Sequence, residues 1–402
     1  MKPAKRKPTL LALNAGSSSI RFAIYQAGRP MRRVLYGKVE RIGLSGTLLS
    51  FSDHPGGSAG CLKVAAGSVE AFLVGWLKKQ PAFACIGAIG HRIVHGMERT
   101  EPARVTARLL GQLRRTAPFD PDHLPREIAL VQAFRRRHPG IPQVACFDTA
   151  FHRTMPRVAR MLAIPRRFEA MGVVRYGFHG LSYEYLMGEL RRTAGPLEAR
   201  GRVILAHLGN GASLAAVHRG RSIDTSMGFT PASGLVMSTR SGDLDPGIAG
   251  FLARRAGMDA ERFQDMVNKE SGLLGVSGTS SDMRDLLARR ARDVRAAEAV
   301  DLFCYQAAKW IGAYAAALGG LDSLVFSGGI GENSPEVRKR ICSRLGFLGV
   351  RLDRRRNAAG APRISAAAGP VAVRVIRTDE ELMIARTVAR VLGLAGSRKN
   401  TS

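Results

Sequence analysis

The sequence lacks the features that mark several common classes of protein. Its five cysteines are widely separated and include no Cys-x-x-Cys pair or Cys/His spacing typical of zinc or redox sites, so we expect plain reduced thiols: Cys61, Cys85, Cys146, Cys304 and Cys342. No apolar run approaches the roughly 18 residues of a membrane span. The short apolar stretch after the basic N-terminus runs into a polar turn, without a signal-peptide cleavage site. We therefore expect a cytoplasmic protein with no membrane partner.

Acidic residues are scarce relative to basic ones. There are 61 Lys and Arg against 32 Asp and Glu, which gives a formal net charge of +29. Such a charge attracts nucleic acid, anionic lipid or anionic substrates. The basic residues form short clusters, such as 135–137 and 354–356, with no interleaved aromatics, zinc finger or RNP-like motif. This pattern does not support specific nucleic-acid binding, and a strong salt dependence of binding to random DNA would be the sign of that alternative.

The chain alternates strand and helix signals, as α/β proteins do. Its 402 residues, 45% hydrophobic and 23% charged, suit two or three ordinary globular domains. Residues 9–13 and 20–25 read as two strands joined by a small polar turn at 14–19. The same pattern returns at 203–217, where Gly and Asn form the turn. Two such units half a chain apart suggest a duplicated domain with a ligand held between the copies.

A third glycine-rich segment lies near the C-terminus. An apolar stripe predicts a helix over 297–318, which two glycines end. A buried strand at 323–326 leads to a glycine turn at 328–333, and a helix then starts with Ser334 as N-cap. Such a turn admits a phosphate or a nucleoside, because glycine has no Cβ to hold the ligand off. The chain has no Walker A motif, no protein-kinase glycine loop and no Gly-x-Gly-x-x-Gly of a Rossmann unit.

Ten motifs resemble, in the same order, those of the acetate and propionate kinase family. The resemblance runs from residue 9 to about 392, and its motifs lie at 13–19, 90–96, 147–152, 176–180, 207–213, 224–231, 239–243, 280–284, 329–333 and 378–382. Each motif alone is a weak signal, because Gly, Asn and Ser also dominate ordinary turns. Ten in order are specific.

The resemblance implies an α/β fold of two duplicated RNase H-like domains, of the actin, hexokinase and Hsp70 type, with a central nucleotide cleft. It implies a homodimer. Domain I, on the acyl-substrate side, would comprise 1–151 plus a returning C-terminal helix in 381–402. Domain II, which would bind the nucleotide, would comprise 152–380.

The implied reaction is the reversible, Mg²⁺-dependent transfer of the ATP γ-phosphoryl group to a short-chain carboxylate. Its products are ADP and an acyl phosphate, acetyl phosphate in the case of acetate, and Mn²⁺ is an alternative metal. The chemistry needs positioning and charge neutralisation more than covalent help, because negative charge spreads over the equatorial oxygens. The alternatives are a kinase for propionate, butyrate or a hydroxy acid, and a non-catalytic nucleotide-binding member of the fold.

The resemblance assigns four catalytic residues. Arg92 and Arg240 would clamp the carboxylate and the phosphoryl group, since a guanidinium offers paired donors and stays charged. His179 would donate to the phosphoryl group as the transition state forms. Asp148 would either orient an arginine and the waters of the metal or act as an acid/base. A carboxylate needs no deprotonation to attack phosphorus, so the electrostatic role is favoured.

Metal and nucleotide positions follow from the same resemblance. Glu380 would contact Mg²⁺, with Asn14 near the metal or its waters. Alternatively, Thr378 and Glu381 form a capping box and Glu380 is only a first-turn acid of the last helix. The expected ATP- and ADP-binding residues are Arg21, His207, Leu208, Gly209, Asn210, Gly211, Asp282, Met283, Arg284, Gly329, Ile330, Gly331, Glu332 and Asn333.

The acyl-substrate side shows the most informative departure from the family. His123 matches the family's substrate-side histidine, and the apolar pocket for the acyl group would comprise the positions of Val94, Asp122, Phe178 and Pro231. Asp122 replaces an apolar residue and would repel a carboxylate, so the preferred acid need not be acetate. Five other positions also depart from the usual residue: Arg21 for lysine, Met97 for glycine, Leu181 for threonine, Tyr183 for histidine and Ser233 for glutamate.

Overall fold

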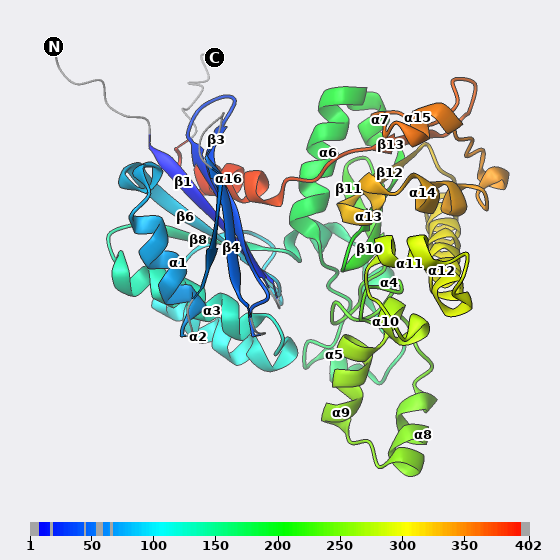
Figure 1. The fold of residues 1–402 in the computed structure, drawn as a ribbon, viewed down its shortest axis with the longest axis horizontal. Coiled ribbons are helices and arrows are strands. Elements are labelled where there is room, and N and C mark those ends of the chain that lie inside the picture. The colour runs from blue at the N-terminus through cyan, green and yellow to red at the C-terminus, as the bar shows by residue number, and fades with distance from the viewer. Residues whose placement is uncertain (1–7, 17–18, 44–45, 54–58, 65–66, 395–402) are drawn as a thin grey trace. The chain divides into compact units, whose positions relative to one another are not determined.

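The computed structural model describes residues 8–16, 19–43, 46–53, 59–64 and 67–394. The chain forms two compact units (Figure 1). Unit 1 comprises Met1–Ala150 and Asp379–Ser402, and unit 2 comprises Phe151–Thr378. The domain boundaries were expected after residues 151 and 380. They lie instead after residues 150 and 378, which places Glu380 in unit 1. Among the described residues, no helix combines the length and the apolar composition that a membrane span requires.

Unit 1 is built on an eight-stranded sheet in the order β5-β4-β3-β2-β1-β6-β8-β7. Its strands are β1 (Thr9–Ala15), β2 (Ser19–Gln26), β3 (Arg32–Glu40), β4 (Leu48–Asp53), β5 (Ala59–Lys63), β6 (Ile86–Ile93), β7 (Ala103–Arg104) and β8 (Gln143–Phe147). The predicted first hairpin is confirmed, since β1 pairs antiparallel with β2; Ser17 and Ser18 of its turn lie outside the described residues. The strands β1, β6 and β8 run parallel to one another.

Helices cover the sheet of unit 1. They are α1 (Val69–Lys78), α2 (Ala107–Thr116), α3 (Leu124–Arg137) and the returning α16 (Glu380–Val391), with short 3₁₀ turns at Pro81–Cys85 and Ala117–Phe119. Leu13, Phe22 and Phe134 lie in one core cluster with side chains of α1 and α3. On β6, a Cβ added to Gly90 would lie 2.4 Å from a side-chain carbon of Ile384, so this glycine lets α16 pack directly on the sheet.

Unit 2 repeats the central part of this topology. Its sheet has the order β11-β10-β9-β12-β13, formed by β9 (Arg202–Leu208), β10 (Ala212–His218), β11 (Arg221–Thr225), β12 (Ser323–Ser327) and β13 (Ala372–Val375). The first three strands are antiparallel and the last two continue parallel to β9. This is the pattern of β3-β2-β1-β6-β8 in unit 1. The duplicated α/β fold expected from the two hairpins is confirmed.

The helices of unit 2 include two long ones. Side chains of α6 (Gly180–Ala194) form a core cluster with β9, β10 and β12. The helix expected over 297–318 is α12 (Val294–Leu318), which begins three residues earlier because Asp293 caps it, and ends at Gly319 as expected. The shorter elements are η3 (Ala150–Thr154), α4 (Arg157–Arg160), α5 (Arg166–Glu169), α7 (Pro196–Arg200), α8 (Gly247–Ala256), α9 (Ala260–Asp265), the π turn η4 (Met266–Glu270), α10 (Gly272–Ser277), α11 (Met283–Arg289), α13 (Gly328–Asn333), α14 (Pro335–Cys342), η5 (Gly346–Leu348) and α15 (Arg354–Ala358).

Two local predictions are wrong. The segment 328–333 is not an open glycine turn but the short helix α13, and only Gly328 adopts a positive φ, where a Cβ would lie 2.6 Å from the carbonyl oxygen of Leu208. Thr378 and Glu381 do not form a capping box. Asp379 caps α16 instead by accepting a hydrogen bond from the N–H of Leu382 at 2.8 Å. The predicted start of α14, with Ser334 as N-cap, is confirmed.

Candidate active site

In unit 1 the structure brings Arg92 and Asp148 together. Arg92 is the next-to-last residue of β6 and Asp148 follows the neighbouring parallel strand β8, so both lie at the carboxyl ends of adjacent strands. Arg92 Nη2 donates to Asp148 Oδ2 at 2.8 Å, and Nη1 donates to the carbonyl oxygen of Ala15 at 3.2 Å. The two side chains are 12% and 1% exposed. A buried carboxylate so placed fixes the plane of the guanidinium.

A second carboxyl group, that of Glu127, lies against the same arginine, and sequence reasoning missed it. Both its oxygens accept the backbone N–H of Val94, at 2.9 and 3.2 Å, and Oε1 lies 3.7 Å from Arg92 Nη1. Burial raises the pKa of Glu127 to about 8, although Arg92 and the Val94 N–H oppose the shift. The signal in the sequence was an acid on the apolar stripe of α3, which also contains Leu124 and Ile128.

The two predicted metal contacts also lie together. Asn14 is the next-to-last residue of β1, and its amide donates to Glu380 Oε2 at 2.7 Å and to Glu381 Oε1 at 3.1 Å. Burial, followed by the charge of Glu380, raises the pKa of Glu381. Two adjacent carboxyl groups suit a divalent cation. In the described part of the chain no three His, Cys, Asp or Glu side chains form a complete metal site, so Mg²⁺ here needs water and phosphate oxygens as well.

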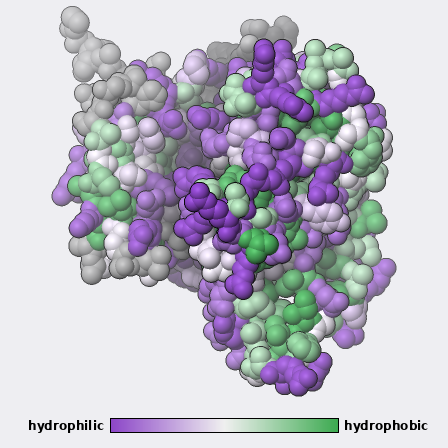
Figure 2. All heavy atoms as spheres, turned by 45° about the vertical axis from the view of Figure 1, so that its right-hand side comes forward, coloured by the Kyte–Doolittle hydropathy of each residue, from purple (hydrophilic) through white to green (hydrophobic). Residues whose placement is uncertain are grey.

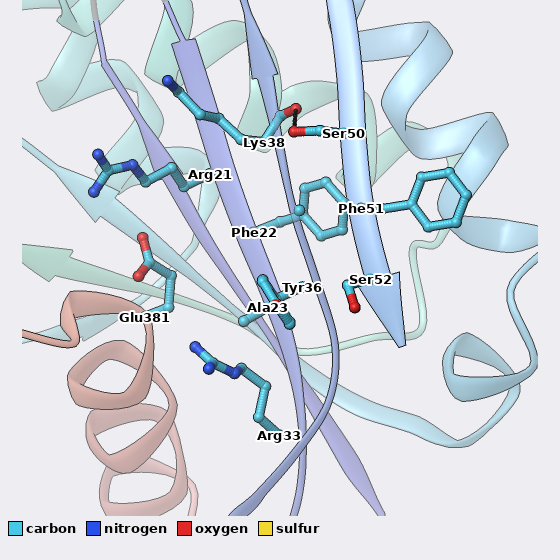
Figure 3. A pocket seen from close by; sticks show the side chains of 11 residues that line it. Arg21, Phe22, Ala23, Arg33, Tyr36, Lys38, Ser50, Phe51, Ser52 and Glu381 are labelled. Carbon is cyan, nitrogen blue, oxygen red and sulfur yellow. Dashed lines mark hydrogen bonds between the residues drawn. The ribbon is translucent and has the colours of Figure 1, made fainter. Parts of the chain in front are cut away.

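Arg21 stands on β2 directly opposite Asn14. Figure 3 shows its side chain and that of Glu381 converging at one side of a pocket of about 390 Å³. Arg33 and Lys38 line the same pocket from β3. Arg21, the predicted phosphate contact, therefore lies near the carboxyl group of Glu381 and close to Asn14, a predicted metal contact.

The predicted acyl-substrate residues divide between the two units. In unit 1, Val94 is 1% exposed, Asp122 is half-buried, and the ring of His123 bonds through Nδ1 to Asp120 Oδ1 at 2.8 Å. In unit 2, Phe178 is buried and Pro231 half-buried. Glu127 links the predicted acyl pocket to the arginine, because its carboxyl group accepts the N–H of Val94 and lies against the guanidinium of Arg92.

In unit 2 three predicted elements converge. A Cβ placed on Gly211 would lie 3.2 Å from His179 Nε2 and 3.6 Å from Arg240 Nη1, so the imidazole, the guanidinium and the bare glycine backbone surround one spot. Arg240 Nη1 also donates to the carbonyl oxygen of Pro231 at 3.1 Å. His179 has a left-handed backbone with φ of 58°, a conformation that a histidine adopts only where its surroundings hold it. This arrangement offers two side-chain donors to one anion.

The β9–β10 turn and α13, the two segments predicted to bind the nucleotide, lie side by side. A Cβ on Gly209 would be 3.7 Å from the backbone nitrogen of Gly329. Leu208, a predicted nucleotide contact, is fully buried, so in this structure it presents no surface to a ligand. Glu332 uses its carboxylate within the protein: Oε1 accepts the N–H groups of Gly328 at 2.9 Å and Thr378 at 3.1 Å. It therefore supports the segment from within.

Four more residues were predicted to bind the nucleotide. One of them ends α13, and the other three lie at the start of α11. Asn333 donates to the carbonyl oxygen of Gly329 at 2.9 Å and closes α13. Asp282 caps α11 and pairs with Arg284 at 2.6 Å, while Met283 is buried. The contacts of Asp282 are thus those of a helix start, and Arg284 is largely exposed.

Comparison with known proteins gives a single answer. A family model described as "Acetokinase family" matches residues 9–386. The chain is 45% identical over 397 residues to an acetate kinase of Rhodopseudomonas palustris, covering 95% of this chain and 98% of that protein. The crystal structure of Porphyromonas gingivalis acetate kinase matches with a TM-score of 0.86 and 37% identity, covering 96% of this chain and 100% of that one. A propionate kinase from Francisella tularensis matches with a TM-score of 0.88 and 36% identity, covering 94% and 98%. The chain belongs to the acetokinase family.

Proposed function

We propose that this protein is an acetate kinase that transfers the γ-phosphoryl group of ATP reversibly to acetate, giving acetyl phosphate and ADP. Membership of the acetokinase family makes it a phosphotransferase. The observation that carries the assignment is the convergence of His179 Nε2, Arg240 and the backbone of Gly211 on one spot in unit 2. Donors around one point are what a transferring phosphoryl group requires.

Each unit supplies part of the chemistry. In unit 2, Arg240 and His179 donate to the equatorial phosphoryl oxygens, whose negative charge grows in the transition state. In unit 1, Arg92 holds the attacking carboxylate, and Asp148 fixes the orientation of Arg92. Acetate attacks as the anion, so the reaction has no proton for Asp148 to remove, and its hydrogen bond to Arg92 supports the electrostatic role.

We propose that Asn14 and Glu380 hold Mg²⁺ together with the phosphates of the nucleotide, and that Mn²⁺ can replace it. The metal, when bound, neutralises charge on the phosphates. The β9–β10 turn, α13 and the start of α11 hold ATP or ADP, mostly through backbone groups. Arg21 adds a cation near the phosphates.

A kinase for another short acid is the second candidate, and Asp122 is the observation that favours it. Asp122 is half-buried and directly precedes His123, on the predicted acyl side. A hydroxyl or a longer chain on the substrate would interact with it differently from the methyl group of acetate. Propionate, butyrate and hydroxy acids are therefore the competing substrates.

The test is hydroxylamine trapping of the acyl phosphate with Mg-ATP and, in parallel, acetate, propionate, butyrate, lactate and no acid. We expect acyl hydroxamate with acetate, and a loss of at least about a hundredfold in Arg240→Ala. Arg108→Ala is the matched control, because Arg108 is an exposed arginine on α2. The proposal fails if protein that binds ATP forms no hydroxamate with any acid.

We also propose that the protein acts as a homodimer in the cytoplasm. Large apolar side chains are exposed on two segments of unit 2, at Val158, Met161, Ile164 and Met171, and at Leu244 and Phe251. Hydrophobic residues reach the surface in the lower part of Figure 2, where α8 and α9 lie. Exposed patches of this kind commonly mark an interface. Light scattering coupled to gel filtration should give twice the chain mass, and Phe251→Asp should reduce it.

A further inference from the structure

A buried hydroxyl pair lies behind the catalytic histidine proposed above. Ser213 Oγ on β10 is 2.8 Å from His179 Nδ1 and 2.5 Å from the hydroxyl of Tyr183. Tyr183 stands one helical turn after His179 on α6. Both Tyr183 and Ser213 have no exposed surface. The inner nitrogen of His179 is therefore bonded to the protein, while Nε2 faces Gly211 and Arg240.

We infer that Tyr183 is a positioning residue for the phosphoryl transfer: acting through Ser213, it holds His179 as the neutral tautomer that carries its proton on Nε2. This inference rests on the proposed function, because it assigns His179 the donor role. In this chain of hydrogen bonds Tyr183 donates to Ser213, and Ser213 donates to His179 Nδ1. His179 Nε2–H then donates to the phosphoryl oxygen.

The direction of this chain follows from counting protons. Ser213 has one proton and stands between two groups, so it donates to one and accepts from the other. A phenol is more acidic than an aliphatic alcohol and is the better donor, which leaves the serine proton for Nδ1. The opposite direction would put the proton of a neutral ring on Nδ1 and a lone pair on Nε2, facing an anionic phosphoryl group. That arrangement would repel the substrate instead of binding it.

A second ring supports the neutral state of the first. His207 stacks on His179 with ring centroids 4.2 Å apart and planes 22° from parallel. Its Nδ1 bonds to Ser182 Oγ at 2.8 Å, and Ser182 Oγ bonds to Thr378 Oγ1 at 2.8 Å. Two stacked imidazolium ions beside the guanidinium of Arg240 would repel one another. The stack also restricts rotation of the His179 ring, and the left-handed backbone of His179 sets the direction in which its Cβ points.

The tyrosine at position 183 is a departure from the family, and it affects how the hydrogen-bond chain responds to pH. A histidine is usual there in the family, and histidine changes protonation near neutral pH. A tyrosine hydroxyl keeps its proton up to about pH 10. The tautomer of His179 should accordingly stay the same across the whole neutral range.

The test is carried out on the full-length protein labelled with ¹⁵N-histidine. Long-range ¹H–¹⁵N spectra distinguish the two neutral tautomers, and the signal of His179 is identified by its loss in His179→Gln. We expect the Nε2–H tautomer in the wild type. Finding the Nδ1–H tautomer or the imidazolium in the wild type at pH 7.5 would overturn the inference. This result does not depend on whether the protein phosphorylates acetate, so it is separate from a failure of the proposed function.

Tyr183→Phe keeps the ring and removes only the hydroxyl. We expect kcat to fall roughly tenfold, the KM values for ATP and acetate to stay within about twofold, and the His179 spectrum to show both tautomers. Tyr314→Phe is the matched control, since Tyr314 is buried in unit 2 and its hydroxyl has no partner within the described residues. An unchanged kcat and spectrum in Tyr183→Phe would also overturn the inference. Should Tyr183→Phe not fold, the wild-type spectrum decides alone.

Discussion

Replacing Glu127 with glutamine should remove a pH dependence of carboxylate binding that the structure builds into unit 1. Glu127 is 2% exposed, and its Oε1 lies 3.7 Å from the guanidinium of Arg92, which is already paired with Asp148. Burial raises the pKa of Glu127 to about 8. At neutral pH the group is mainly protonated, so the negative charges that offset Arg92 are those of Asp148 and Glu380. Above pH 8 the charge of Glu127 adds to them and competes with the substrate.

The size of the effect follows from Coulomb's law. A carboxylate bound on the other side of Arg92 would lie roughly 7 Å from the Glu127 carboxylate. With an effective dielectric constant of about 20, the repulsion between two like charges at that distance is about 2 kcal/mol. This corresponds to roughly a 30-fold loss of affinity. The KM for acetate should therefore rise by up to that factor as pH increases from 7 to 9.5, while kcat changes less.

The same group affects stability with a definite sign. The pKa of Glu127 in the folded protein lies above its ordinary value of 4.5. Its contribution to stability is therefore fully present below about pH 4.5 and is lost as pH rises through about 8. A shift of this size is worth about 5 kcal/mol between the two protonation states. Glutamine stays neutral, so Glu127→Gln should gain stability relative to the wild type as pH rises from 6 to 9.

The assay measures the KM for acetate at saturating Mg-ATP between pH 6 and 9.5, and thermal unfolding over the same range. Wild type should show the rise in KM, and Glu127→Gln should show a nearly flat profile. Glu98→Gln is the control, because Glu98 is an exposed glutamate of the same unit. The reasoning is refuted if the wild-type KM is flat to pH 9.5, or if Glu127→Gln follows the wild-type rise.

Three further predictions concern glycine and the left-handed backbone, and urea unfolding checks each of them. Gly188→Ala should stabilise the protein by about 1 kcal/mol, since Gly188 is exposed within α6 and a Cβ there meets nothing within 4 Å. Gly272→Ala should cost about 2–4 kcal/mol and lower kcat, because a Cβ would lie 2.2 Å from the carbonyl oxygen of Met237 and 2.7 Å from that of Arg240. Met97→Gly should stabilise by about 1 kcal/mol, because Met97 has a φ of 50°; an unchanged or lower stability would show that its side chain compensates for the strain.

Much of the fold was predictable where one local signal dominated. The two hairpins and the helix α12 follow from alternation and from an apolar stripe, and their ends follow from small turn residues and Gly319. Local sequence patterns do not identify the strands β3, β4 and β5, because their burial is mixed and each forms by pairing in turn with the preceding strand, β3 on β2, β4 on β3 and β5 on β4.

The two wrong local predictions have a common physical cause. Thr378 looked like the cap of the last helix, but Ser182, almost two hundred positions earlier, bonds to its hydroxyl, and Asp379 takes the capping role. Glycines suggested a loop at 328–333, but the carboxylate of Glu332 accepts the N–H of Gly328 and stabilises a helix there. In both cases side-chain hydrogen bonds, from the distant Ser182 at Thr378 and from Glu332 within α13 itself, decided between conformations that the local sequence allows.

The positions of the proposed site residues follow from the duplication itself. In each unit the first strand runs into a hairpin turn, and the strands parallel to it end at the same edge of the sheet, because the carboxyl ends of parallel strands lie together. In unit 1 these ends carry Asn14, Arg92 and Asp148, which are charged or strongly polar. In unit 2 they carry His207 and the glycines that begin α13, which offer an imidazole ring and bare backbone.

In the proposed function, this difference gives the two copies of one topology different roles. In this proposal, unit 1 holds the carboxylate and the metal with charged groups. These are the Arg92–Asp148 ion pair and the carboxylate of Glu380, to which the neutral amide of Asn14 donates. A nucleotide phosphate is better held by backbone N–H groups and uncharged donors, which bind it without an acid nearby to repel it. The neutral state that we infer for His179 fits this division. A charged His179 ring would add a second cation beside Arg240. A neutral Nε2–H donor instead leaves Arg240 as the main cation facing the phosphoryl group.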